Sequence, residues 1–185
     1  MQERTKEILN GLTERYPALK VAKNDISAAF EALLASVKNG GKIMICGNGG
    51  SAADSAHIVG ELMKSFKKTR PIDAKTAARL KEYGKEGARL ALSLEGAIPA
   101  VALTENGAFL TAFSNDKDAS VAFAQQVYGL GEQRDALVCI STSGNSENCV
   151  LAAVAAKATE IKTVALTGAG GVPGEIKRRS PARAA

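Results

Sequence analysis

Two stretches of the sequence combine glycine with hydroxyl side chains in a pattern suited to anion binding. The first is Gly47-Asn48-Gly49-Gly50-Ser51, which follows a short apolar run and precedes a predicted helix. Glycines let backbone N–H groups approach an anion closely, and a helix N-terminus adds free N–H groups and partial positive charge. We expect Ser51 to cap that helix. A plain strand-to-helix turn would explain the same residues, and neither GxGxxG nor a Walker loop is present.

The second stretch is Ser141-Thr142-Ser143-Gly144-Asn145-Ser146, which places four hydroxyls around one glycine before another predicted helix. Hydroxyl and backbone N–H donors together form a neutral cradle that suits a dianionic phosphate. A simple polar turn is the alternative for this stretch taken alone. Two such loops on one sheet are a more specific signal than either loop by itself.

His57 and Glu61 are four residues apart on the helix predicted after the first loop, so they share one helical face. His57 is the only histidine of the chain and is predicted one and a half turns from the glycine loop. The pair could bind a metal or move a proton beside a ligand; a surface i,i+4 contact is the structural alternative. Asn115-Asp116, after Ser114, is predicted to form a polar turn.

The elements that must hold these residues follow from the apolar pattern. Two N-terminal helices are predicted up to Asn39-Gly40-Gly41, with a break at Tyr16-Pro17. Further helices are predicted over 52–66 and 147–157, and strands over 42–46, 100–104, 135–140 and 163–167. Strand, polar loop and helix in repeated order predict a parallel sheet, whose ligands bind beyond the carboxyl ends of the strands.

Residues 67–98 are less regular than the rest of the chain. A helix is predicted over 73–83, after which Gly84 and Gly87 are expected to break the pattern. We interpret the segment as an excursion between core elements.

The composition indicates a globular protein and argues against a nucleic-acid-binding, secreted or membrane protein. The chain has 185 residues, 45% apolar and 23% charged, which fits one globular domain. Its net charge of +5 owes much to four cations in the last nine residues, so no nucleic-acid partner is expected. Cys46, Cys139 and Cys149 show no CxxC spacing and are predicted to be buried, reduced thiols. Neither a signal peptide nor a membrane span is predicted, and we expect a cytoplasmic protein.

Several motifs in the same order resemble the sugar isomerase (SIS) domain, and within it the phosphoheptose isomerases. The motifs are GNGGSAADSAHIVGEL at 47–62, SND at 114–116 and STSGNSENCV at 141–150. The resemblance implies an α/β three-layer sandwich with a central parallel sheet, of flavodoxin-like type, over residues 1–171. It also implies isomerisation of sedoheptulose 7-phosphate to D-glycero-D-manno-heptose 7-phosphate through a cis-enediol, by a homotetramer in which neighbouring chains help build each site.

The resemblance assigns roles by position. Asn48, Gly49, Gly50 and Ser51 would touch the substrate, and Asn115 and Asp116 would contact the sugar chain. The phosphate would be held by Ser141, Thr142, Ser143 and Ser146. Glu61 would be the catalytic base beside His57, and these two residues would contribute to a zinc site.

The sequence departs from the family pattern in two places. The excursion at 67–98 is longer than expected. The family also continues into a C-terminal helix that supplies a Gln and a His, whereas here no Gln follows Gln133, no His follows His57, and 172–185 reads as a disordered basic tail. The C-terminal helix is therefore expected to be missing and the zinc ligand set incomplete, with activity lowered at least roughly a hundredfold.

Two other hypotheses stay open at this point. One is a non-catalytic SIS module that binds a sugar phosphate or a protein partner, as relatives that bind the replication initiator protein do. The other is a truncated or frame-shifted product. The intact His57 and Glu61 pair favours an enzyme, because a pure binding module does not need it.

Overall fold

The structure, a computed structural model, describes residues 3–168 and is built on one parallel sheet. Its strands are β1 (Ile43–Gly47), β2 (Ala100–Ala102), β3 (Ala136–Ser141) and β4 (Lys162–Thr167), in the order β2-β1-β3-β4. All four predicted strands and their parallel pairing are confirmed. Because β1 and β3 are neighbours, with Gly47 opposite Ile140, the two loops that follow them leave the same edge of the sheet.

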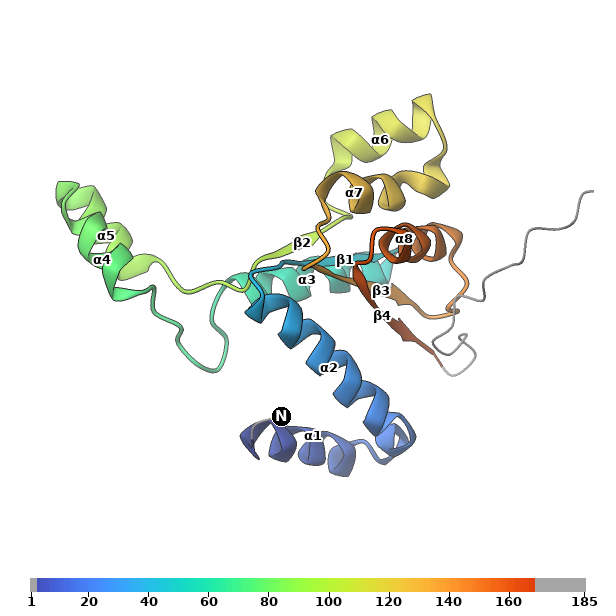
Figure 1. Cartoon of the computed structure of the whole chain (residues 1–185), viewed down its shortest axis with the longest axis horizontal. Coiled ribbons are helices and arrows are strands. Elements are labelled where there is room, and N and C mark those ends of the chain that lie inside the picture. Colours follow the sequence, from blue (N-terminus) through green and yellow to red (C-terminus); the bar gives the residue numbers. More distant parts are fainter. Residues whose placement is uncertain (1–2, 169–185) are drawn as a thin grey trace, which may run out of the picture.

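Helices cover both faces of the sheet, as expected for a three-layer α/β sandwich (Figure 1). On one face, α7 (Ala122–Leu130) and α8 (Glu147–Ala158) pack over Met44, Leu137 and their neighbours. On the other, α2 (Lys23–Lys38) and α3 (Gly50–Met63) pack over Ile45 and Val138. Alternate residues of each strand thus face opposite layers, which explains why β1 is apolar at every position before Gly47.

The three cysteines lie in the layer between the sheet and α8, where all are buried and free, as predicted. Cys46 Sγ lies 3.6 Å from Cys139 Sγ on the neighbouring strand. Hydrogen bonds with Cys139 and Cys149, together with burial, raise the pKa of Cys46 far above its usual range. Cys46 is therefore a neutral core thiol.

The N-terminal segment consists of α1 (Glu3–Arg15), a 3₁₀ helix η1 (Pro17–Ala22) and α2. The predicted interruption at Tyr16-Pro17 is confirmed, since Pro17 begins the 3₁₀ helix. The predicted stop after α2 is confirmed as well: Gly40 adopts a φ of +74°, a conformation that glycine takes at little cost.

Residues 74–93 form two antiparallel helices, α4 (Ala74–Lys81) and α5 (Gly84–Ser93), which we call the arm. The arm projects away from the sheet, and its helices pack on each other (Figure 1). The predicted break is confirmed at Gly84, where α4 has ended and α5 begins, but it is wrong at Gly87. Gly84, with a φ of +68°, makes the turn, and Gly87 lies inside α5, where a Cβ would come within 1.7 Å of Leu80 O.

Between β2 and α7 lie α6 (Gly107–Asp116) and a short 3₁₀ helix η2 (Ala119–Val121). Asn115 and Asp116 form the end of α6, so the prediction of a turn at these residues is wrong. The helix is started by the Asn106 side chain, which accepts from the Phe109 N–H.

Two expectations, the basic tail at 172–185 and the missing C-terminal helix, lie outside the described residues. Over residues 3–168, no helix has the length and apolar character needed to cross a membrane.

Candidate functional site

The glycine loop connects β1 to α3 in a tight turn. Gly49 takes a φ of +55°, and a Cβ on Gly47 would come within 2.7 Å of Ser51 Cβ, so glycine is required at Gly47 by close packing. Helix α3 begins at Gly50 with Gly49 in the N-cap position and no capping side chain. Ser51 is thus inside the helix and does not cap it, contrary to prediction, and His57 stands about two turns from the helix start.

The hydroxyl loop connects β3 to α8 and folds back on itself. Ser141 Oγ and Ser146 Oγ are 3.0 Å apart, and the Gly144 N–H donates to Ser141 O at 3.0 Å. Ser146 occupies the N-cap position of α8, but its side chain makes no capping bond to the helix. Thr142 and Ser143 are exposed, so their hydroxyls are open to a ligand at the N-terminal end of α8.

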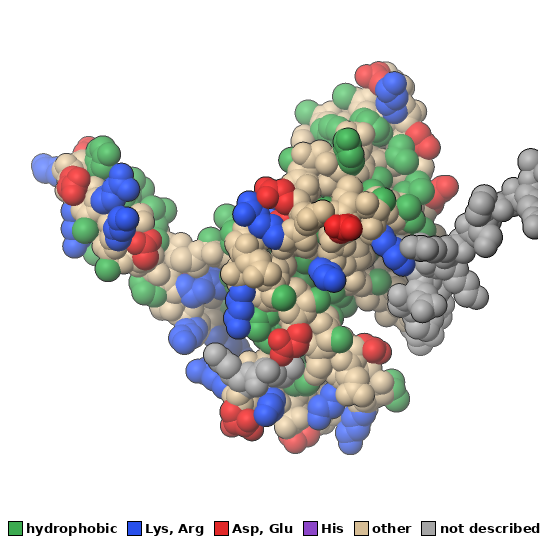
Figure 2. Space-filling view, viewed as in Figure 1, with side chains coloured by type: hydrophobic (Ala, Val, Ile, Leu, Met, Phe, Trp, Pro, Cys, Tyr) green, Lys and Arg blue, Asp and Glu red, His purple; other side chains and the backbone are tan. Residues whose placement is uncertain are grey.

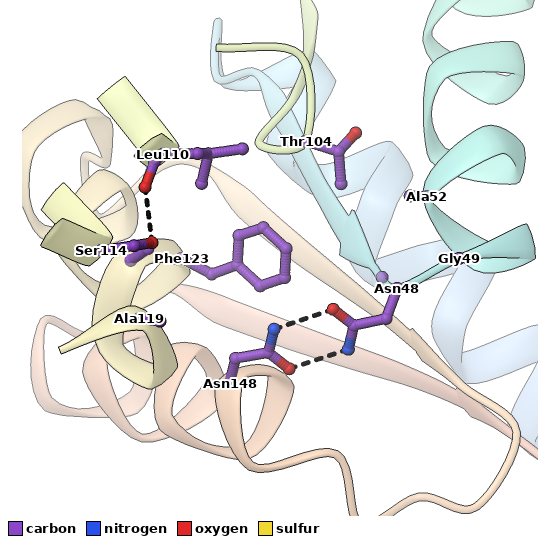
Figure 3. A pocket seen from close by; sticks show the side chains of 11 residues that line it. Asn48, Gly49, Ala52, Thr104, Leu110, Ser114, Ala119, Phe123 and Asn148 are labelled. Carbon is purple, nitrogen blue, oxygen red and sulfur yellow. Dashed lines mark hydrogen bonds between the residues drawn. The ribbon is translucent and has the colours of Figure 1, made fainter. Parts of the chain in front are cut away.

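A pair of amides joins the two loops. Asn48 Nδ2 donates to Asn148 Oδ1 and Asn148 Nδ2 donates to Asn48 Oδ1, both at 2.8 Å (Figure 3). Beside the pair is a pocket of about 280 Å³. It is lined by Gly47, Asn48, Gly49, Ala52, Thr104, Leu110, Ser114, Ala119, Ala122, Phe123 and Asn148. The walls alternate apolar carbon with amide and hydroxyl groups, which suits an uncharged polyol chain.

His57 and Glu61 share one face of α3, as predicted, with His57 Nε2 3.8 Å from Glu61 Oε1. Lys64 Nζ also contacts Glu61 Oε1, at 3.0 Å. The second oxygen, Oε2, is buried and accepts no hydrogen bond from any described residue. An unpartnered carboxylate oxygen is costly unless a ligand or a proton meets it, so Glu61 is a strong candidate for a chemical role.

A second pocket, of about 560 Å³, opens beside this pair. It is lined by His57, Glu61, Phe66, Lys67, Lys68 and Arg70. Gly47, Asn48 and Gly49 line the first pocket and not the second, so the glycine loop and the carboxylate face separate cavities within one chain. Residues 141–146 of the hydroxyl loop line neither of these two pockets. Three cations around the second pocket favour anionic or hydroxylated ligands.

Arg70 fixes the end of the helix that carries Glu61. Its guanidinium donates to Leu62 O and Lys64 O, at 2.8 and 2.6 Å, and to Gly96 O at 2.8 Å. The first two carbonyls belong to the last turn of α3 and to its C-cap, where no intrahelical donor remains. Arg70 therefore joins the end of α3 to the segment that enters β2.

Comparisons with known proteins show which family this chain belongs to. The family model described as "SIS domain" matches residues 10–97 and 90–168. A phosphoheptose isomerase from Akkermansia muciniphila is 38% identical over 177 residues, which cover 96% of this chain and 79% of that protein. The chain belongs to the phosphoheptose isomerase family of SIS domain proteins.

Other phosphoheptose isomerases are similar to this chain in sequence and in structure. The enzyme of that name from Aromatoleum aromaticum is 38% identical over 151 residues, and the matched part spans 64% of its length. Solved structures of phosphoheptose isomerases from Neisseria gonorrhoeae and Francisella tularensis are similar, with TM-scores of 0.61 and 0.63 and identities of 33% and 31%. They cover 90% and 93% of this chain, which covers 77% and 79% of theirs. The non-catalytic alternative is not favoured by these matches.

The remaining residues expected from the family are dispersed. Asn115 and Asp116 are exposed and bonded to each other, Asn115 Nδ2 to Asp116 Oδ1 at 2.9 Å, while the adjacent Ser114 lines the first pocket. Asn148 and Phe123 also line that pocket and were not predicted. Asn148 could have been found from its place in the first turn after the hydroxyl loop. Phe123 carries no signal in the sequence, because a core aromatic looks the same.

The residues described for this SIS domain do not fit a zinc ion by themselves. A catalytic zinc site normally has three protein ligands and one open position. His57 and Glu61 supply two, and within residues 3–168 no three His, Cys, Asp or Glu side chains come together as a metal site.

Proposed function

We propose that this protein isomerises sedoheptulose 7-phosphate to D-glycero-D-manno-heptose 7-phosphate. Membership of the phosphoheptose isomerase family supports this substrate. The reaction moves a proton from C1 to C2. A base removes the C1 proton, the bonding electrons form the C1=C2 bond of a cis-enediol, and the ketone oxygen gains a proton; C2 then takes a proton as the C1 hydroxyl becomes the aldehyde.

Glu61 is the proposed base, and its buried, unpartnered Oε2 is the observation that carries the proposal. Oε1 is paired with Lys64 at 3.0 Å and lies 3.8 Å from His57, whereas Oε2 has no partner among the described residues. A general base must lie within reach of the proton it removes, and Glu61 lines the second pocket. His57, being exposed, could exchange protons with the substrate oxygens. No step requires the zinc ion that the family resemblance implied.

Phosphate binding is assigned to Ser141, Thr142, Ser143 and Ser146, and substrate contacts to the glycine loop from Asn48 to Ser51. The exposed hydroxyls of Thr142 and Ser143 at the N-terminal end of α8 support the first assignment. Asn48 and Gly49 line the first pocket, which supports the second. Asn115 and Asp116 remain proposed sugar contacts.

We further propose a cytoplasmic homotetramer in which a neighbouring chain helps close each site. Two observations support an oligomer: the glycine loop and Glu61 face separate pockets in one chain, and large apolar side chains are exposed on the arm and the N-terminal helices. Among them are Leu92, 86% exposed, and Val21, 93% exposed. Figure 2 shows that Lys and Arg side chains also gather on the arm.

The test is a comparison of two isosteric variants. Glu61→Gln removes the base and should lower the isomerisation rate by at least about a hundredfold, since general base catalysis contributes about 10²–10⁴-fold. Glu14→Gln, on the exposed surface of α1, is the matched control and should keep the wild-type rate. Equal rates in Glu61→Gln and wild type would remove Glu61 from the mechanism.

A further inference from the structure

The orientation of the Asn48 and Asn148 amides is fixed by the backbone. Asn148 Oδ1 accepts from the Cys149 N–H at 3.0 Å, and a backbone N–H can only donate. The atom facing Cys149 must therefore be the oxygen of Asn148. The reciprocal bonds then fix the orientation of the Asn48 amide as well (Figure 3).

This orientation determines what the pair has left to offer. Asn148 Oδ1 accepts twice, from Asn48 Nδ2 and from Cys149 N, so both of its lone pairs are used. The remaining N–H of Asn48 faces Cys149 Sγ at 4.0 Å. One lone pair on Asn48 Oδ1 and one N–H on Asn148 Nδ2 are left. These two atoms lie 2.8 Å apart at the wall of the first pocket.

We propose that the pair recognises one hydroxyl group of the sugar chain, and that Asn148 is a specificity residue that contacts it. The hydroxyl donates to Asn48 Oδ1 and accepts from Asn148 Nδ2, because a hydroxyl is both donor and acceptor. An ionised phosphate oxygen only accepts, so it could use the N–H of Asn148 but not the remaining lone pair of Asn48 Oδ1. The pocket agrees with this choice: among the described residues no Lys or Arg lines it, and Leu110 and Phe123 offer apolar contact to a carbon chain. The inference rests on the proposed sugar-phosphate substrate.

The test compares two ligands on one variant. Asn148→Ala should raise the dissociation constant for sedoheptulose 7-phosphate by about three- to tenfold, the effect of losing one neutral hydrogen bond. The dissociation constant for inorganic phosphate, which has no carbon chain, should change by less than about twofold. Calorimetry gives both constants. Asn24→Ala, an exposed asparagine of α2, is the matched control and should bind both ligands as wild type does.

Each other outcome has a definite meaning. If Asn148→Ala weakens both ligands equally, the pair only braces the loops and the inference is wrong; unchanged binding of the sugar phosphate also overturns it. If wild type binds phosphate but not the sugar phosphate, the proposed function fails first and the inference with it. Should the variant not fold, the side-chain amide NMR signals of Asn148 in wild type decide: they should shift with sedoheptulose 7-phosphate and not with inorganic phosphate.

Discussion

The hydroxyls of Ser141 and Ser143 are neutral donors, and the proposed phosphate site depends on them. A ligand that binds only the folded protein raises its melting temperature by mass action. Replacing both residues by alanine removes two hydrogen bonds, each contributing about 0.5–1.5 kcal/mol. The rise in melting temperature with a sugar phosphate should therefore shrink markedly in the double variant, while Ser93→Ala, on the exposed side of α5, should leave it unchanged. An undiminished rise would place the phosphate elsewhere.

Asp135 is a charged residue buried in the core. Its side chain is 1% exposed, pairs with Lys42 Nζ, and accepts from the backbone N–H groups of Lys42 and Glu132. Burial alone would raise the pKa of Asp135, but the hydrogen bonds from Lys42 and Glu132 outweigh it and lower that pKa. A lowered folded-state pKa means that the stabilisation is present above the unfolded pKa of about 3.9 and is lost as pH falls through the folded value.

Asp135→Asn should therefore lower the free energy of unfolding at pH 7 by about 3–5 kcal/mol, because it leaves Lys42 without its buried partner. It should also flatten the fall in stability between about pH 4 and the acid limit. Urea unfolding from pH 3 to 7 measures both, with Asp54→Asn, an exposed residue of α3, as control. A variant as stable as wild type at pH 7 would show that the ion pair contributes nothing net.

Among the elements, the arm should be removable without unfolding the sheet and the helices that cover it. The backbone bridge between Pro71 and Glu95 closes its base, and the Gly96 N–H donates to Arg70 O. Replacing residues 72–94 by a short Gly-Ser turn should thus leave the folded core largely intact. Arg70→Ala should destabilise more, because it removes three hydrogen bonds, including those to Gly96 O and Lys64 O; Leu62 O keeps the bond from the Ile98 N–H. Urea unfolding of both variants tests this. A lower urea midpoint for the chain without residues 72–94 than for Arg70→Ala would contradict the prediction.

The strands of the sheet and several of the helices that cover it were predictable because their apolar residues are regularly spaced. Examples are the apolar stripe of α2 and the apolar run of β1. The second helix of the arm was not. Gly84 and Gly87 both carry the local signal of a break. Gly84 makes the turn as predicted, whereas Gly87 lies inside α5 and gives the room that Leu80 O needs. That distinction depends on a contact between two helices, which no local pattern encodes.

The candidate site, too, could be predicted from the sequence only in part. The two loops and the pair His57 and Glu61 were recognisable from residue type and spacing. The bond between Asn48 and Asn148 joins residues 100 apart in sequence, and only the adjacency of β1 and β3 brings them together. Likewise, the spacing of His57 and Glu61 did not indicate that they would face a pocket separate from that of the glycine loop.

For the whole molecule, the exposed apolar residues of the arm and N-terminal helices predict self-association. Light scattering at micromolar concentration should give the mass of four copies of the 19.2 kDa chain. Leu92→Glu, which puts a charge on the arm, should weaken the assembly if the arm lies in an interface, whereas Thr76→Glu on α4 serves as an exposed control. A monomer in the wild type would overturn the tetramer and leave each site to a single chain.

The most direct test of the proposed function is the isomerisation itself, followed by NMR in D₂O with sedoheptulose 7-phosphate as substrate. Proton transfer through Glu61 and an enediol predicts D-glycero-D-manno-heptose 7-phosphate with deuterium at C2, since a carboxylic acid exchanges its proton with solvent. Isomerisation by proton transfer through Glu61 is contradicted if no product forms although the sugar phosphate binds, or if the product keeps the original C1 hydrogen in full at C2.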